Sequence, residues 1–293
     1  MEIFGISTAL LGSQLLVGLI NGSFYAILSL GLAIIFGLLN IINFSHGAQY
    51  MMGAFVAWIA LTRFRINYWV SLIAAPLVVG LLGVLIERLM LRRLYKLDHL
   101  YGLLLTFGLA LIFEGVFRDQ FGISGESYEV PEALSGGINL GFMFLPIYRG
   151  WVIIASLTVC FGTWYMIERT KLGAYLRAGT ENSQMVQALG INVPLLITFT
   201  YGYGVALAAF AGVLAAPIFQ VNPLMGSNLI IVVFAVVVIG GMGSIMGSIL
   251  TGLGLGLIEG LTKVFYPEAS SVVVFVIMVI VLLVRPAGLF GKS

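Results

Sequence analysis

The sequence predicts an all-α polytopic membrane protein with eight or nine transmembrane helices, one or two of them broken or re-entrant. Of its 293 residues, 60% are hydrophobic and 9% are charged, and the mean hydropathy is +1.11. Soluble domains are nearer half apolar and a quarter charged. The apolar runs are continuous rather than alternating, which favours helices over barrel strands, because lipid offers backbone groups no hydrogen bonds. We expect residues 1–293 to form one domain.

Most of the apolar runs approach the ~20 residues that a spanning helix needs. They are residues 10–39, 68–91, 100–117, 151–167, 195–219, 243–261 and 272–284. The first run is far longer than a signal-peptide core, so we expect a retained helix there. Two further segments are irregular. Residues 44–61 are interrupted at Ser45-His46-Gly47, and residues 227–239 form a short Val/Ile run that ends at a Gly-rich turn. Either segment is a full crossing or a re-entrant piece.

Lys and Arg in short loops predict which side of the membrane each loop occupies, because such loops favour the cytoplasm. The basic residues are Arg88, Arg92, Arg93 and Lys96, then Arg169, Lys171 and Arg177, then Arg285 and Lys292. The longest polar stretch, residues 118–149, carries Asp119, Glu126, Glu129 and Glu132, and we place it outside. The C-terminus is then cytoplasmic.

Several functional classes are excluded. The formal net charge is +2 with dispersed basic residues, so no nucleic-acid partner is expected. Cys160 is the single cysteine and His46 and His99 are the two histidines, so neither a disulfide nor a metal site is expected. We find no nucleophile–base set, hence no catalytic residues. A Gly-x4-Gly-Lys-Ser/Thr phosphate loop is also missing from the sequence, so the chain should bind no nucleotide cofactor.

Glycine and charge spacing predict how the helices pack. The pairs Gly18–Gly22, Gly243–Gly247, Gly252–Gly256 and Gly256–Gly260 are each four residues apart, which places both members of a pair on one helix face and favours close helix contact. Glu114 with Arg118 and Glu259 with Lys263 have i,i+4 spacing, for which ordinary pairing near helix ends is the simplest explanation. Glu87, beside Arg88, is expected to anchor the loop that follows.

Polar side chains gather in the break between the first two apolar segments. They are Asn40, Asn43, Ser45, His46 and Gln49, and Asn21, Ser23 and Tyr25 precede them on the first helix. Polar groups at membrane depth should face protein or a watery cavity. We therefore assign these residues to a substrate path. The alternative is a set of satisfied interhelical hydrogen bonds.

Residues 168–194 are too polar to span a membrane. The pattern predicts a cytoplasmic helix at about 173–189 that stops at Gly190. Its apolar side consists of Leu172, Tyr175, Met185, Val186 and Leu189. Arg177 and Glu181 are expected to pair at i,i+4 on another side. Taken alone, this pattern also fits a helix that rests on the membrane surface.

The same segment resembles the cytoplasmic coupling loop of LivH-type permeases, which belong to the high-affinity branched-chain amino-acid ABC importers. Gly173, Arg177, Ala178, Ala188, Gly190, Ile191 and Asn192 match a Gly-x3-Arg-Ala helix that ends in Gly-Ile-Asn. Similar stretches begin at Asn21, Ile42, Gly240 and Arg285. They read Asn-Gly-Ser-Phe-Tyr-Ala, Ile-Asn-Phe-Ser-His-Gly, Gly-Gly-Met-Gly-Ser-Ile-x-Gly and Arg-Pro-Ala-Gly-Leu-Phe-Gly. Together they cover nearly the whole chain in order.

The resemblance implies a permease subunit in a bacterial inner membrane. Its partners would be a second related permease, two cytoplasmic ATP-binding subunits that use Mg-ATP, and a periplasmic substrate-binding protein. The residues that couple to the ATPases would be Gly173, Arg177, Ala178, Glu181, Asn182 and Gly190. Closure of the ATPases would drive alternating access.

The substrate is expected to be a branched-chain or other small hydrophobic amino acid. Relatives that carry urea, short amides or other small solutes keep the alternative open. An ion-coupled secondary carrier is a rival from another class, and such carriers usually keep acidic or His relays at mid-membrane.

Overall fold

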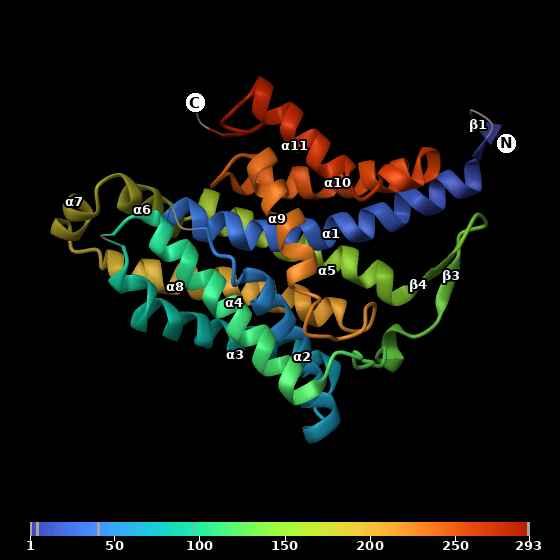
Figure 1. Cartoon of the computed structure of the whole chain (residues 1–293), viewed down its shortest axis with the longest axis horizontal. Coiled ribbons are helices and arrows are strands. Elements are labelled where there is room, and N and C mark those ends of the chain that lie inside the picture. The colour runs from blue at the N-terminus through green and yellow to red at the C-terminus, as the bar shows by residue number, and fades with distance from the viewer. Residues whose placement is uncertain (1, 4–5, 40–41, 96, 292–293) are drawn as a thin grey trace.

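The computed structural model describes residues 2–3, 6–39, 42–95 and 97–291, and it is a bundle of long helices with two short hairpins (Figure 1). The main helices are α1 (Thr8–Leu39), α2 (His46–Phe64), α3 (Tyr68–Leu89), α4 (His99–Phe121), α5 (Ile147–Arg169), α8 (Val193–Ala215), α9 (Ser227–Gly240), α10 (Ile245–Phe265) and α11 (Val273–Val284). The shorter elements are α6 (Lys171–Glu181), α7 (Ser183–Ala188), and the 3-10 turns η1 (Leu91–Arg93), η2 (Glu132–Leu134) and η3 (Pro267–Ala269). The hairpins pair β1 (Glu2–Ile3) with β2 (Ile6–Ser7) and β3 (Gly137–Asn139) with β4 (Phe144–Pro146).

The predicted fold class is confirmed, since each apolar run of the sequence lies mainly in a helix. Among the described residues, 6 helices are long and apolar enough to cross a membrane: α1, α3, α4, α5, α8 and α10. α9 and α11 are shorter apolar helices, and α2 has 19 residues with His46 and Gln49 in its first turns. The number of full crossings stays a prediction.

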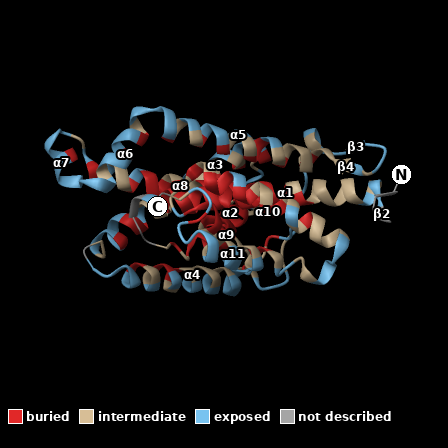
Figure 2. Ribbon diagram, turned by 90° about the horizontal axis from the view of Figure 1, so that it is seen from above, coloured by how far each residue is buried: buried red, intermediate tan, exposed pale blue. Residues whose placement is uncertain are grey.

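The core is built around α1, α2 and α8, whose middle parts are buried (Figure 2). α3 and α4 lie outside them and expose apolar side chains. Glycines bring the central helices together. A Cβ at Gly18 of α1 would lie 2.5 Å from the carbonyl oxygen of Gly256, and one at Gly252 of α10 would lie 2.6 Å from the nitrogen of Ala26. Only glycine permits such an approach, so the close packing predicted from Gly18–Gly22 and from the glycines of α10 is confirmed.

The Gly243–Gly247 pair is an exception. Gly243 precedes α10 in a turn with φ of +84°, and Gly247 packs on Gly240 instead. The prediction that this pair shares a helix face is therefore wrong, because Ser244 caps α10 between the two glycines through a hydrogen bond from the Gly247 nitrogen.

The two ends of the bundle differ in charge. α6, α7 and the α3–α4 link with η1 lie at the left of Figure 1, and we call this the basic end, after its arginines. The acidic stretch between α4 and α5, with β3–β4, reaches to the right, and we call this the acidic end. The predicted segregation of loops is present, and the assignment of the basic end to the cytoplasm stays a prediction.

The C-terminal tail holds the irregular α9 in place. α9 ends at Gly240, and Gly241 follows with φ of +99°. The backbone nitrogens of Leu289 and Phe290 donate to the carbonyls of Ile239 and Gly240 at 2.8 and 3.2 Å. The tail therefore satisfies helix-end carbonyls that a short buried helix would otherwise leave free.

Candidate substrate path and coupling segment

The polar break forms a closed ring of hydrogen bonds between α1 and α2. Ser45 Oγ donates to Asn43 Oδ1 at 2.6 Å, Asn43 Nδ2 donates to Gln49 Oε1 at 3.2 Å, and Gln49 Nε2 donates to Ser45 Oγ at 3.1 Å. All three side chains are buried. We call this set the polar ring. It satisfies its members without placing a charge in the bundle.

The side chain of His46, the first residue of α2, is held separately by a contact with α1. Its Nε2 lies 3.0 Å from the carbonyl oxygen of Leu28. A carbonyl only accepts, so we assign the ring hydrogen to Nε2. The other nitrogen, Nδ1, is buried and has no partner among the described residues. A Cβ at Gly31 would lie 3.0 Å from the imidazole, so the ring fits against α1 only because a glycine is there.

Sequence reasoning missed two residues of this region because both lie in apolar runs. Tyr201 of α8 is buried, and its hydroxyl lies close to the polar ring. Thr106 of α4 accepts a hydrogen bond from the Phe44 nitrogen at 3.2 Å and donates to the Ile42 carbonyl at 3.1 Å. α4 is thereby tied to the break by its one buried hydroxyl.

The residues predicted on α1 do not join the polar ring. Ser23 Oγ donates to its own helix, at Leu19, over 2.8 Å. Tyr25 donates to Glu259 Oε2 of α10 at 2.7 Å, and Asn21 is half-buried. No hydrogen bond in the described part of the chain links these three to the ring, and Asn40 lies outside the described residues. The assignment of all of them to a substrate path stays a prediction.

The segment after α5 differs from its predicted form. Instead of one helix at 173–189, α6 and α7 meet at Asn182, whose backbone leaves the helical region at φ −147°. Its side chain accepts from the Met185 nitrogen at 2.9 Å. The prediction of a single helix is therefore wrong, because asparagine caps a new helix more readily than it continues an existing one. Gly190 does end α7 as predicted, with φ of +86° and the Ile191 nitrogen bonded to Val186.

Arg177 braces this segment against α5. It pairs with Glu168 Oε2 at 3.2 Å and donates to the Ile167 carbonyl at 3.3 Å. The predicted Arg177–Glu181 pair is absent from the described structure, since Arg177 turns back toward α5, where the last carbonyls are free to accept. A Cβ at Gly173 would collide with that same Ile167 carbonyl, so glycine permits the tight turn from α5 into α6.

The outer surface of α6 and α7 is exposed. Ala178, Glu181, Asn182 and Gly190 are exposed, whereas Gly173 is buried. Of the predicted apolar side, Val186 is buried but Met185 and Leu189 are 64% and 74% exposed. Beside the segment, a wide hollow opens to solvent between Trp164, Arg169, Arg177 and the tail residue Phe290. The exposed surface of α6 and α7, which carries both apolar and polar side chains, is available for contact with another molecule.

The fold and the buried break define a multi-pass helical membrane protein, and the described residues hold no cluster that could bind a metal. The family described as "Branched-chain amino acid transport system / permease component" matches residues 14–282. The chain belongs to this family.

Named relatives match over nearly their whole length. The chain is 33% identical to the "High-affinity branched-chain amino acid transport system permease protein BraD" of Pseudomonas aeruginosa, with 95% of each chain covered. It is 29% identical to the permease protein LivH of Escherichia coli, again over 95% of each. A "Probable branched-chain amino acid transport permease protein LivH" of Methanocaldococcus jannaschii is 28% identical, over 96% of this chain and 93% of the relative. No solved structure matches the chain.

Proposed function

We propose that this chain is the permease subunit of an ATP-driven importer that carries branched-chain or similar small hydrophobic amino acids. The observation that carries the proposal is the family match over residues 14–282, together with the relatives' names. The direction of transport is inward, into the cytoplasm, and the membrane is the bacterial inner membrane. The basic end faces the cytoplasm, because loops rich in Arg favour that side.

The surface made by α6 and α7 couples the permease to its ATPases. It projects from the basic end and leaves Glu181, Met185 and Leu189 free for a partner. Arg177, braced on Glu168, passes a force on α6 to the end of α5, which runs through the bundle. One ATP-binding subunit contacts this surface, and a second contacts the matching surface of the partner permease.

The other partners follow from the two remaining surfaces. A second related permease completes the pore, since the polar ring is buried within the described part of this chain. A substrate-binding protein delivers the solute at the acidic end. The polar ring and His46 lie along the path of the solute through the membrane. Movement of these side chains, rather than a change in their charge, opens that path.

Purification of the tagged chain from its native membrane tests the assignment of partners. We expect it to bring down ATP-binding subunits and a second permease, and we expect ATP hydrolysis only when they are present. Hydrolysis of ATP by the chain alone, or recovery without any ATP-binding subunit under conditions that preserve membrane complexes, contradicts the proposal. Uptake of urea or a short amide in place of leucine by the recovered complex would favour the alternative substrate class.

A further inference from the structure

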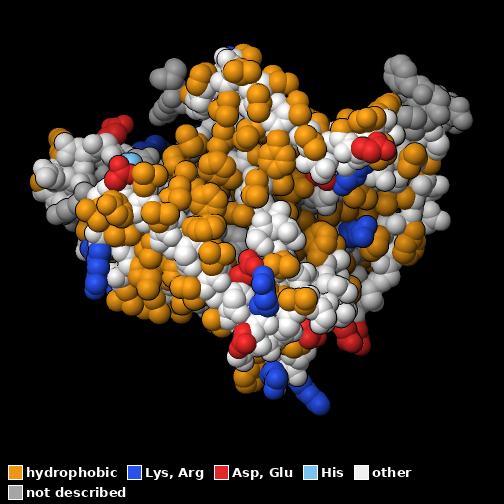
Figure 3. All heavy atoms as spheres, viewed as in Figure 1, with side chains coloured by type: hydrophobic (Ala, Val, Ile, Leu, Met, Phe, Trp, Pro, Cys, Tyr) orange, Lys and Arg blue, Asp and Glu red, His pale blue; other side chains and the backbone are white. Residues whose placement is uncertain are grey.

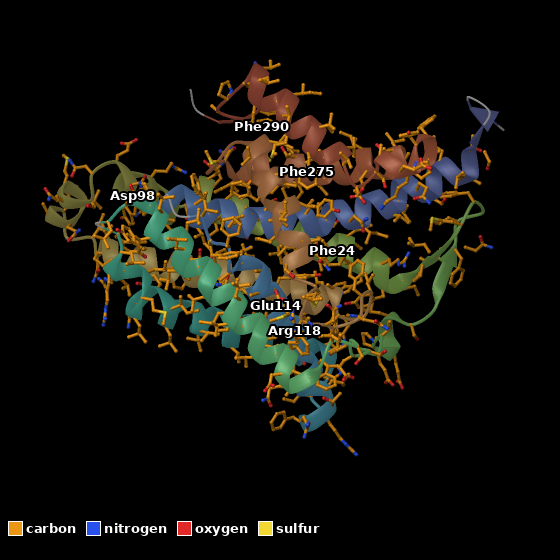
Figure 4. The ribbon with its side chains drawn as sticks, in the orientation of Figure 1. Phe24, Asp98, Glu114, Arg118, Phe275 and Phe290 are labelled. Atoms are coloured by element: carbon orange, nitrogen blue, oxygen red, sulfur yellow. The ribbon has the colours of Figure 1, made fainter. Side chains whose placement is uncertain are left out.

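A slot runs between α4 and the start of α9, beside the polar break. It has about 430 Å³ of space, open solvent at its mouth included, and is lined by Phe44, Phe107, Ala110, Leu111, Glu114 and Ile230, among others. Figure 3 shows one acidic and one basic side chain together near the middle of a largely apolar face, and Figure 4, in the same orientation, labels Glu114 and Arg118 there. The slot offers room for one small solute.

The walls of the slot are apolar because of the spacing along α4. Phe107, Ala110, Leu111 and Glu114 recur at i, i+3, i+4 and i+7, so they share one face of the helix. Phe44 stands edge-on to Phe107, with ring centroids 6.1 Å apart. An aliphatic side chain placed among these groups would be shielded from water, which is favourable in proportion to the apolar area that it buries.

Glu114 lines the slot at the side nearer the acidic end, and Arg118, the next residue along that helix face, pairs with it. Arg118 Nη2 lies 2.6 Å from Glu114 Oε1, and the Glu114 side chain is only 18% exposed. Glu114 lies about two turns inside the end of α4 at Phe121, at a depth where an ion pair that faces lipid is costly. Such a pair is expected where a polar solute, protein or water meets it.

The pair keeps spare binding capacity. Glu114 Oε2 forms no hydrogen bond in the described part of the chain, and Arg118 uses one of its donors on Glu114. The other i,i+4 pair is a useful contrast, since Glu259 receives Lys263 on one oxygen and Tyr25 on the other. The free oxygen of Glu114 can accept a hydrogen bond from an ammonium group, and the unused donors of Arg118 can bind a carboxylate beside it.

We propose that this slot binds an α-amino acid with a branched aliphatic side chain. Its ammonium lies against Glu114, its carboxylate against Arg118, and its side chain between Phe107, Ala110 and Ile230. The zwitterion and the ion pair each carry one positive and one negative group, so each charge of the solute faces its opposite. This inference rests on the proposed function and deepens it, because it places the substrate beside the polar break: Phe44 and Gly47 line the slot and belong to that segment.

Cysteine labelling of the complete importer in nanodiscs tests the slot directly. The native Cys160 is fully buried, so, once reactive cysteines of the partner subunits are replaced, a Cys introduced by Ala110→Cys reports on the slot with little background. We expect saturating L-leucine to slow its reaction with a methanethiosulfonate reagent several-fold. 4-Methylpentanoate, which lacks the ammonium, and 3-methylbutylamine, which lacks the carboxylate, should protect poorly.

Two matched variants control for structure. Gly108→Cys lies on a different face of α4, about a third of a turn from the slot face, where an added Cβ meets nothing within 4 Å, and its labelling should ignore leucine. In the Ala110→Cys background, Glu114→Gln should raise the half-protecting leucine concentration roughly 10- to 100-fold, the effect of losing a charged hydrogen bond. Asp119→Asn, an exposed carboxylate on the same helix, should leave that concentration unchanged.

ATP-driven leucine uptake by the same preparations separates the two claims. If Ala110→Cys supports uptake but leucine gives no protection, or protects equally after Glu114→Gln, the slot is not the substrate site and the import function stands. If the wild-type complex imports no branched-chain amino acid, the proposed function itself is wrong.

Discussion

Thr198 on α8 donates a hydrogen bond of 2.6 Å to Oε2 of Glu87 on α3. The other carboxyl oxygen of Glu87 accepts from the Tyr95 hydroxyl at 2.8 Å, and Glu87 is fully buried. The sequence predicted that Glu87 anchors the following loop, and Tyr95 in that loop confirms it. The bond to α8 was not predicted. One carboxyl group thus ties together α3, the α3–α4 link and α8 at the basic end.

We predict that Glu87→Ala destabilises the bundle by about 2–4 kcal/mol, because it removes a fully buried carboxyl group that accepts hydrogen bonds from buried Thr198 and part-buried Tyr95. Glu87→Gln should cost less, since Thr198 and Tyr95 can each accept as well as donate. Thermal unfolding in detergent measures both. Equal midpoints for Glu87→Ala and the wild type would contradict this role for Glu87.

The coupling surface gives a second prediction, with Glu181 as the probe. Glu181 is exposed and forms no pair in the described structure, so Glu181→Ala should leave folding and membrane insertion intact. We expect it to weaken attachment of the ATPases, because a charge that becomes buried against a partner can contribute far more than an exposed one. Pull-down of the ATPases measures this.

Arg177 is expected to act through Glu168. The pair is half-exposed and should contribute at most about 1 kcal/mol to stability. Arg177→Ala and Glu168→Ala should therefore both allow normal expression and both uncouple ATP hydrolysis from uptake. If α6 and α7 only rest on the membrane, these two variants and Glu181→Ala are silent, and changes at Tyr175, Met185 or Leu189 are the ones that lower stability.

A third prediction concerns the polar ring and His46. Asn43→Leu and His46→Leu should lower transport while the importer still assembles with near-normal basal ATP hydrolysis. Asn43→Leu should also lower the unfolding midpoint, because Ser45 and Gln49 lose buried partners. Thr200→Ala is the matched control, since buried Thr200 of α8 bonds only to its own helix, at the Leu196 carbonyl. Wild-type uptake in both Leu variants would restrict these residues to packing.

The C-terminal tail gives the fourth prediction. Gly288 has φ of +82°, and a Cβ there would lie 2.6 Å from Gly241. Gly288→Ala should therefore detach the tail from the end of α9 and make residues 285–291 sensitive to protease. Gly115→Ala is the control, because nothing lies within 4 Å of an added Cβ there. Unchanged proteolysis of Gly288→Ala would show that the tail does not need this contact.

The elements that the sequence predicted well are those governed by composition along a single segment. Long apolar runs became helices, and the glycines of α1 and α10 became a close contact, since both follow from local spacing. Asn182 shows the limit of this reasoning. Its effect on the helix depends on whether the side chain caps or continues it, and the apolar pattern around it fits either.

Partners across the bundle could not be predicted from spacing. Arg177 stands four residues from Glu181 but bonds to Glu168, nine residues away, because the turn at Gly173 folds α6 back on α5. Tyr201 and Thr106 were missed since each is a single polar group in an apolar run. Such residues become recognisable only when the fold places them beside Asn43 or Phe44.

The central claim is that ATP hydrolysis by partner subunits drives amino-acid import through this chain. It is tested most directly by uptake of labelled L-leucine into proteoliposomes that hold the complete importer and its binding protein. We predict uptake that requires ATP on the basic-end side and persists when an uncoupler collapses the ion gradients. Uptake that proceeds without ATP and stops with the uncoupler would contradict the claim and identify an ion-coupled carrier.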